Sequence, residues 1–183
     1  NMISGRIALD SAWAWALLVL LLAAPGPAAA EAREVKILHV MSYHSPWRWT
    51  DRQLEGFQES LKGVSATYRI FQMDTKRNSA LVQKERKERE ARELIESWKP
   101  DLVYTTDDDA QEHLVKHYVG SSLPFVFSGV GNDPAVYGFK GSPNVAGVLE
   151  HEHFAESVGL VRKLAPKARR IALIFDDAKM WDA

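Results

Sequence analysis

The sequence contains no cysteine among its 183 residues. This absence excludes disulfide bonds, thiol catalysis and cysteine-based zinc sites, and it also excludes the lipid-bearing cysteine of bacterial lipoproteins. An excess of one charge sign is lacking as well, because 23 Lys and Arg residues nearly balance 24 Asp and Glu residues, for a net charge of −1. Nucleic-acid binding requires a basic surface, so we expect no DNA or RNA partner.

Sequence motifs of several enzyme classes are also missing. No P-loop, G-x-S-x-G elbow or G-x-G-x-x-G fingerprint is present, since the nearest pattern, SGVGND at 128–133, lacks the required spacing. His113 and His117 occur in the order E-H-x-x-x-H, which is not the zinc motif H-E-x-x-H and is typical of a solvated helix face. His151 and His153 alternate on an extended segment and supply only two ligands. We therefore predict no enzyme, no metal site and no cofactor.

The amino-terminal 30 residues have the features of a secretory signal peptide. Arg6 precedes an apolar run over 12–24, and Ala28–Ala30 supplies a cleavage pattern of small residues. The run is short for a membrane span, which needs about 20 apolar residues, although an uncleaved anchor is the alternative. We expect cleavage after Ala30 and export of a soluble protein to the periplasm.

Apolar runs and helical stripes alternate along the next hundred residues, in a chain whose 46% hydrophobic and 26% charged residues are typical of globular proteins. Strands are predicted over 35–41, 67–73, 102–105 and 125–130. Helices are predicted after Thr50, which forms a possible capping box with Gln53, and over 81–98 and 110–118. Successive β–α steps predict an α/β fold with a doubly wound parallel sheet and right-handed crossovers.

The pattern changes after residue 130. A loop rich in Gly and Pro leads to a short extended piece, Asn144–Glu150, then to a helix with apolar residues from Phe154 to Ala165 and a strand over 171–175. We interpret 31–143 as a first α/β lobe and 144–183 as a crossover and the start of a second lobe. One helix and one strand are too little to bury a core, so this second lobe is expected to be cut short.

The first predicted strand runs directly into a loop with much aromatic surface. Residues 35–50 read VKILHVMSYHSPWRWT and include Tyr43, Trp47 and Trp49. Ligands of parallel α/β sheets bind at the carboxyl ends of strands, where this loop would lie. We predict that Tyr43 and Trp47 contact a ligand, with packing against the sheet edge as the alternative. Packing is favoured for Trp49, which immediately precedes the predicted helix cap.

Polar groups follow the other strands at the same predicted edge. Ser42 and Ser128 offer hydroxyl groups, and helix amino termini offer free N–H groups to an anion. Asp107 or Asp108 can accept a hydrogen bond from an ammonium group, or can simply cap the helix that follows. The candidate ligand-binding residues are Ser42, Tyr43, His44, Trp47, Asp107, Asp108, Ser128, Gly129 and Glu150. Glu150 lies in the predicted crossover between the two lobes, where it either faces a cleft between them or belongs to a hinge. Together they fit an amino acid or another amine-bearing small molecule.

Six segments resemble those of a known family. They are YHSPWRWTDRQLEGF, FQMDTKRN, KPDLVYTTDDDAQ, LPFVFSGVGNDPAVYG, NVAGVLEHEHF and APKARRIALIFDD, and they cover most of residues 35–178. They are similar to periplasmic substrate-binding proteins of ABC transporters with the type I binding-protein fold, in the family that includes tryptophan- and tyrosine-binding members. The resemblance implies two lobes that close on a small molecule and deliver it to a membrane permease. Similar sequences also serve as extracytoplasmic sensing domains, so a lobe read by a signalling domain is the alternative.

Two positions differ from the family pattern. Many members have a loop of Gly and Thr type where this chain has Asp107–Asp109, and Gly131–Asn132 stands where similar sequences tend to have Asn and then Ala. Carboxylates therefore replace neutral donors at the predicted ligand edge. For this reason the identity of the ligand is not transferred from the family.

Overall fold

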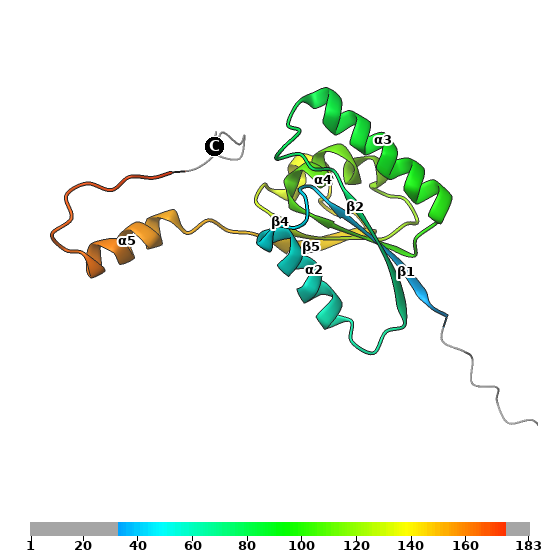
Figure 1. The fold of residues 1–183 in the computed structure, drawn as a ribbon, viewed down its shortest axis with the longest axis horizontal. Helices are drawn as coiled ribbons and strands as arrows, with labels where there is room; N and C mark the ends of the chain where they lie inside the picture. The colour runs from blue at the N-terminus through cyan, green and yellow to red at the C-terminus, as the bar shows by residue number, and fades with distance from the viewer. Residues whose placement is uncertain (1–32, 175–183) are drawn as a thin grey trace, which may run out of the picture. The chain divides into compact units, whose positions relative to one another are not determined.

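A parallel β-sheet forms the centre of the protein (Figure 1), in a computed structural model that describes residues 33–174. Its five strands are β1 (Val35–Met41), β2 (Ala66–Gln72), β3 (Leu102–Thr106), β4 (Phe125–Val130) and β5 (Val145–Leu149), in the order β2-β1-β3-β4-β5. The helices are α2 (Arg48–Ser60), α3 (Leu81–Trp98), α4 (Asp107–His113) and α5 (Phe154–Leu164), with the 3-10 helices η1 (Val115–Tyr118) and η2 (Pro134–Tyr137). All neighbouring strands are parallel, so the predicted α/β class with a doubly wound parallel sheet is confirmed.

The interior strand β1, which lies between β2 and β3, is buried on both faces. Leu38 and Val40 join the main hydrophobic core on one face, and His39 lies on the other because successive side chains alternate. The ring of His39 is fully buried and stacks on Tyr104 of β3, with centroids 4.6 Å apart. Neither ring nitrogen has a hydrogen-bond partner among the described residues, and burial lowers the pKa of His39 to about 3. His39 is therefore a neutral core residue in an otherwise apolar strand.

Helices cover both faces of the sheet (Figure 1). On the face of the main core, Ile95 of α3 packs among the buried strand residues. On the opposite face, Phe57 of α2 stacks on Tyr104, with ring centroids 4.0 Å apart and planes 7° from parallel. The outer face of α3 carries ion pairs such as Arg86 with Glu90, at 2.6 Å, because oppositely charged residues four positions apart are neighbours on a helix surface.

Helix α2 begins earlier than the sequence pattern predicts. Trp47 is its amino-terminal cap residue, and Thr50 lies inside the first turn, fully buried and without a side-chain hydrogen-bond partner in the described part of the chain. The predicted capping box of Thr50 with Gln53 is therefore wrong. Asp51 fixes the start instead, because its carboxylate accepts from Trp47 N at 3.0 Å and from Ser45 Oγ at 2.6 Å.

The segment after residue 143 contributes to the same sheet. Residues 145–149, predicted as an extended crossover, form β5 and pair with β4. Helix α5 forms as predicted, and none of its residues is buried. The strand predicted over 171–175 does not form in its described part, because residues 171–174 have no regular structure and pair with no described strand. The boundaries between lobes stay a prediction.

The predicted signal peptide, residues 1–30, lies outside the described residues. Within residues 33–174, no helix has the length and apolar character needed to cross a membrane.

Ser42 joins the ends of three strands. Its Oγ donates to Thr106 O, at the end of β3, at 2.6 Å and accepts from Ala110 N at 2.7 Å. Its carbonyl oxygen accepts from Thr75 N and Thr75 Oγ1, just after β2, at 3.0 and 2.9 Å. Ala110 N belongs to the first turn of α4, whose N–H groups have no partner within the helix. Ser42 thus caps α4. This helix begins at Asp107, before the predicted start at Ala110, and ends at His113, shortly before η1.

We expect Ser42→Ala to lower the free energy of unfolding by about 1–3 kcal/mol, because it leaves Ala110 N buried without a partner. Chemical denaturation followed by circular dichroism measures this change. Ser60→Ala is the matched control, since the exposed Ser60 Oγ donates to Phe57 O of its own helix, and its effect is expected within about 0.5 kcal/mol. Equal losses in the two variants would contradict the structural role of Ser42.

Candidate functional site

The carboxyl ends of four strands meet at one edge of the sheet. The pairing register aligns Met41 at the end of β1 with both Gln72 of β2 and Thr106 of β3, and aligns Thr106 with Ser128 of β4. The loops that follow these strands carry most of the sequence-predicted site residues. This carboxyl edge is where parallel α/β sheets bind ligands.

Asp107 lies at the centre of the carboxyl edge. It is 2% exposed and has a left-handed backbone conformation, with φ of 64°, which is uncommon outside Gly, Asn and Asp. Its Oδ1 accepts from Trp49 Nε1 at 2.6 Å, and its Oδ2 accepts a longer bond from Gln53 Nε2 at 3.5 Å. Both of these donors are neutral. Burial raises the pKa of Asp107 to about 7, and the bonds from Trp49 and Gln53 only partly oppose this rise.

A network of hydrogen bonds among Gln53, Ser128 and Tyr104 positions the Gln53 side chain beside Asp107. Gln53 Oε1 accepts from Ser128 Oγ at 2.6 Å, and Ser128 Oγ shares a second bond of 2.6 Å with the Tyr104 hydroxyl. Gly129, at φ of 67°, leaves room for this arrangement, since a Cβ there would lie 2.8 Å from Gln53 Oε1 and 3.1 Å from Asp107 Oδ1. Only glycine allows so close an approach in this conformation.

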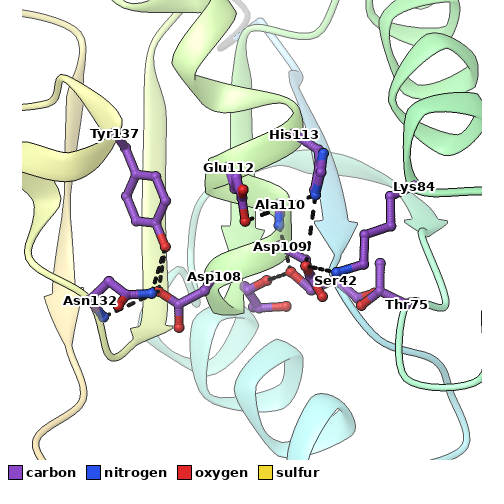
Figure 2. A network of polar contacts seen from close by, with 11 residues as sticks. Ser42, Thr75, Lys84, Asp108, Asp109, Ala110, Glu112, His113, Asn132 and Tyr137 are labelled. Atoms are coloured by element: carbon purple, nitrogen blue, oxygen red, sulfur yellow. Dashed lines mark hydrogen bonds and ion pairs between the residues drawn. The ribbon is translucent and has the colours of Figure 1, made fainter. Parts of the chain in front are cut away.

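The two aspartates after Asp107 have other partners. Asp108 points toward Asn132 and Tyr137, whereas Asp109 points toward Lys84 (Figure 2). The Asp108 carboxylate accepts from Gly131 N, Asn132 N, Asn132 Nδ2 and Tyr137 OH at 2.7–3.2 Å. Burial, followed by the bond to Asp108, raises the pKa of Tyr137. Asp109 accepts from Lys84 Nζ at 2.6 Å. Both carboxylates therefore hold neighbouring segments in place.

One group of side chains on α4 has the spacing of metal ligands. Asp109, Glu112 and His113 present one ligand atom each, all within 4.8 Å of one another (Figure 2). The ammonium group of Lys84 already pairs with Asp109 Oδ1 and would repel a cation there. The arrangement is explained by the ion pair, and we assign no metal to it.

Aromatic side chains gather in the loop after β1. Trp47 stacks on His44, with centroids 5.6 Å apart, and lies 5.3 Å from the ring of Tyr43. Trp47 is 38% exposed, so this aromatic cluster of Tyr43, His44 and Trp47 offers ring surface to solvent. His44 Nδ1 lies 3.4 Å from the Asp74 carboxylate, without hydrogen-bond geometry. Hydrogen bonding to Arg77 is the main cause that lowers the pKa of Asp74.

The structure places the predicted site residues in different surroundings. Ser42 is fully buried in the junction of three strands, and Asp108 is bonded to the loop after β4. Tyr43, His44 and Trp47 form the aromatic cluster, whereas Ser128 and Gly129 lie beside the Asp107 network. Glu150 follows β5, is half-buried, and has its pKa raised by burial and then by the nearby charges of Glu152 and Asp108.

Sequence reasoning missed two partners of Asp107. Gln53 was assigned to a helix cap, and packing was favoured for Trp49, yet both side chains bond to the Asp107 carboxylate. Trp49 and Gln53 are four residues apart, so they share one face of α2. That spacing, together with the position of α2 directly after β1, is the signal that could have placed both side chains at the carboxyl edge.

Two solved structures share this fold. An ABC domain from Streptococcus pneumonia in complex with L-Trp matches with a TM-score of 0.55 and 19% identity, over 74% of this chain and 45% of its own. A ligand-free, open structure of a substrate-binding protein with adhesive properties from Clostridium difficile matches with a TM-score of 0.51 and 18% identity, over 73% and 45%. This chain thus spans a little less than half of each. No protein-family model and no curated protein matches the sequence.

The raised pKa of Asp107 makes stability depend on pH. The pKa is about 7 in the folded protein against an ordinary 3.8, so the folded state holds this proton more tightly than the unfolded state. The resulting stabilisation is complete below pH 4 or so and is lost as the pH rises to about 7. Asp107→Asn keeps an oxygen that accepts from Trp49 and tolerates the positive φ, but it cannot ionise.

We expect wild type to lose about 2–4 kcal/mol of stability relative to Asp107→Asn between pH 4 and pH 8. Guanidinium unfolding of both proteins at several pH values across this range measures the difference. Parallel curves for wild type and variant would show that Asp107 keeps an ordinary pKa.

Proposed function

We propose that this protein is an extracytoplasmic solute-binding protein of an ABC importer, which captures an amine-bearing or amino-acid-like small molecule between two lobes. The observation that carries this proposal is the pairing, on one sheet edge, of the exposed aromatic cluster with the buried carboxylate of Asp107. Aromatic faces attract apolar groups and cations, and a carboxylate attracts a cationic nitrogen. A small molecule with both an apolar group and a cationic nitrogen could bind the aromatic cluster and Asp107 at the same time.

The fold supports a binding role for this edge. Both matching structures are described by what they bind or by substrate binding, and neither description names a catalysed reaction. In a two-lobed protein of this kind, hinge closure would bring a second surface over the carboxyl edge and remove the ligand from water. We therefore assign binding without catalysis and without a cofactor.

Location and partner follow from the same proposal. The signal-peptide pattern of residues 1–30 supports export to the periplasm, where an importer collects its solutes. The closed protein would then dock on an ABC permease in the inner membrane. In the alternative function, a sensing domain, the ligand would bind at the same site, and a signalling domain would detect the closure of the two lobes. Loss of ligand uptake after gene deletion supports the importer and contradicts the sensor.

A thermal-shift screen of the protein against amino acids, aliphatic and aromatic amines, and neutral analogues tests the binding function. A ligand at 100 times its dissociation constant adds about 2.7 kcal/mol, which raises the melting temperature by several degrees. We expect an amine or amino acid to give such a shift, and Trp47→Ala to reduce it.

Val64→Ala is the control for Trp47→Ala. Val64 is 48% exposed and precedes β2, at the opposite end of the strands from the carboxyl edge. The control is expected to keep the full ligand-induced shift. A protein that melts cooperatively and responds to no compound in the screen would contradict the proposal.

A further inference from the structure

Asp107 differs from the other carboxylates of the carboxyl edge. Asp109 pairs with Lys84, Asp74 pairs with Arg77, and Asp108 accepts four hydrogen bonds. Asp107 is more deeply buried than Asp74 or Asp109, yet among the described residues it pairs with no cation and has only one short hydrogen bond. A buried carboxylate with so little compensation is electrostatically unfavourable unless a proton or a cation joins it.

Trp49 connects this carboxylate with the surface. Its Nε1 holds Asp107 Oδ1 at 2.6 Å, while the residue itself is 40% exposed. The side chain belongs to the first turn of α2, which begins at Arg48. A neutral indole N–H is a weaker partner for a carboxylate than a cationic N–H group, because only the cation adds the attraction between two opposite charges. A ligand with a cationic nitrogen can therefore compete for the same oxygen.

We propose that Trp49 is an exchangeable cover over Asp107, and that the cationic nitrogen of the ligand displaces the indole N–H from Asp107 Oδ1. This inference rests on the proposed binding function and assigns its specificity to one residue. The released indole of Trp49 then lies free to contact the ligand. The site selects small molecules that carry an ammonium or similar cation and rejects neutral analogues of the same shape.

The surroundings of Asp107 set the pH dependence of this exchange. Helix α2 presents the neutral Trp49 and Gln53, β3 presents the Tyr104 hydroxyl, and β4 presents Ser128 and Gly129. The neighbouring Asp108 carboxylate on α4 adds a negative charge that raises the pKa of Asp107, after the larger effect of burial. Because the cation binds the ionised carboxylate, its affinity increases as the pH rises through about 7 and then levels off.

Tryptamine and indole-3-propionate are the probes for this proposal. They carry the same ring, but the first bears only an ammonium and the second only a carboxylate. We expect tryptamine to bind with at least tenfold higher affinity than indole-3-propionate, measured by titration calorimetry. Asp107→Asn is expected to weaken tryptamine binding at least tenfold at pH 8 and to remove its increase with pH.

Trp49 itself provides a direct readout. The full chain is labelled with ¹⁵N-tryptophan, and the Nε1–H signal of Trp49 is identified among the six tryptophans by its absence from Trp49→Phe. In the free protein we expect this signal to shift with a midpoint near pH 7, as Asp107 ionises, and to stay constant in Asp107→Asn. Saturation with tryptamine is expected to move the signal toward that of a tryptophan without a carboxylate partner.

Asp109→Asn is the matched control, because it removes the same charge two residues away from a carboxylate that pairs with Lys84. It is expected to change tryptamine affinity by no more than about twofold. Tryptamine binding that leaves the Trp49 signal unmoved, or that is equally tight in Asp107→Asn, would overturn this inference and leave the proposed binding function intact. Failure of every compound to bind, tryptamine included, would overturn both.

Discussion

The hydrogen bonds of Ser42 fix the geometry on which the carboxyl edge depends. Through its hydroxyl and carbonyl groups this one residue connects the end of β1 to Thr75 after β2, to Thr106 at the end of β3 and to Ala110 in α4. The strand register alone aligns the three ends, but it does not orient the segments beyond them. Because Ser42 caps α4, the helix starts immediately after β3, and the short connection places Asp107 in a left-handed conformation inside the sheet edge.

Unfavourable features concentrate where the ligand is proposed to bind. Asp74 and Asp107 both have positive φ, which is uncommon for residues other than glycine, and both follow a strand at the carboxyl edge. The Asp107 carboxylate adds the cost of desolvation. Such features persist only when the surrounding structure enforces them. Here the enforcing elements are the apolar strands β1, β3 and β4 and the stack of His39, Tyr104 and Phe57 beneath the site. The core is thus stable enough to hold a strained edge.

Local sequence patterns predicted the helices and strands well, but they predicted the location of the site without the contacts among its residues. The strands over 35–41 and 125–130 and the helix over 81–98 have the predicted boundaries, since an apolar run or a helical stripe is contained within the segment itself. The three consecutive aspartates, by contrast, look alike in sequence and are distinguished by contacts with other elements, such as those with Trp49, Tyr137 and Lys84. The buried role of Ser42 and the partnership of Gln53 with Asp107 likewise depend on contacts between distant segments.

The same desolvation that weakens the free protein can make ligand binding selective. An exposed carboxylate would gain little from a cation, because water already solvates both charges. Asp107 has lost that solvation and, among the described residues, has received only neutral donors in exchange. A cationic ligand that reaches Asp107 therefore gives the carboxylate the charged partner that it lacks in the folded protein. A neutral molecule of equal size gains only contacts with the aromatic rings. In the proposed function, selectivity for a charged ligand therefore comes from the incomplete solvation of Asp107, and closure of a second lobe would increase this selectivity by excluding the remaining water.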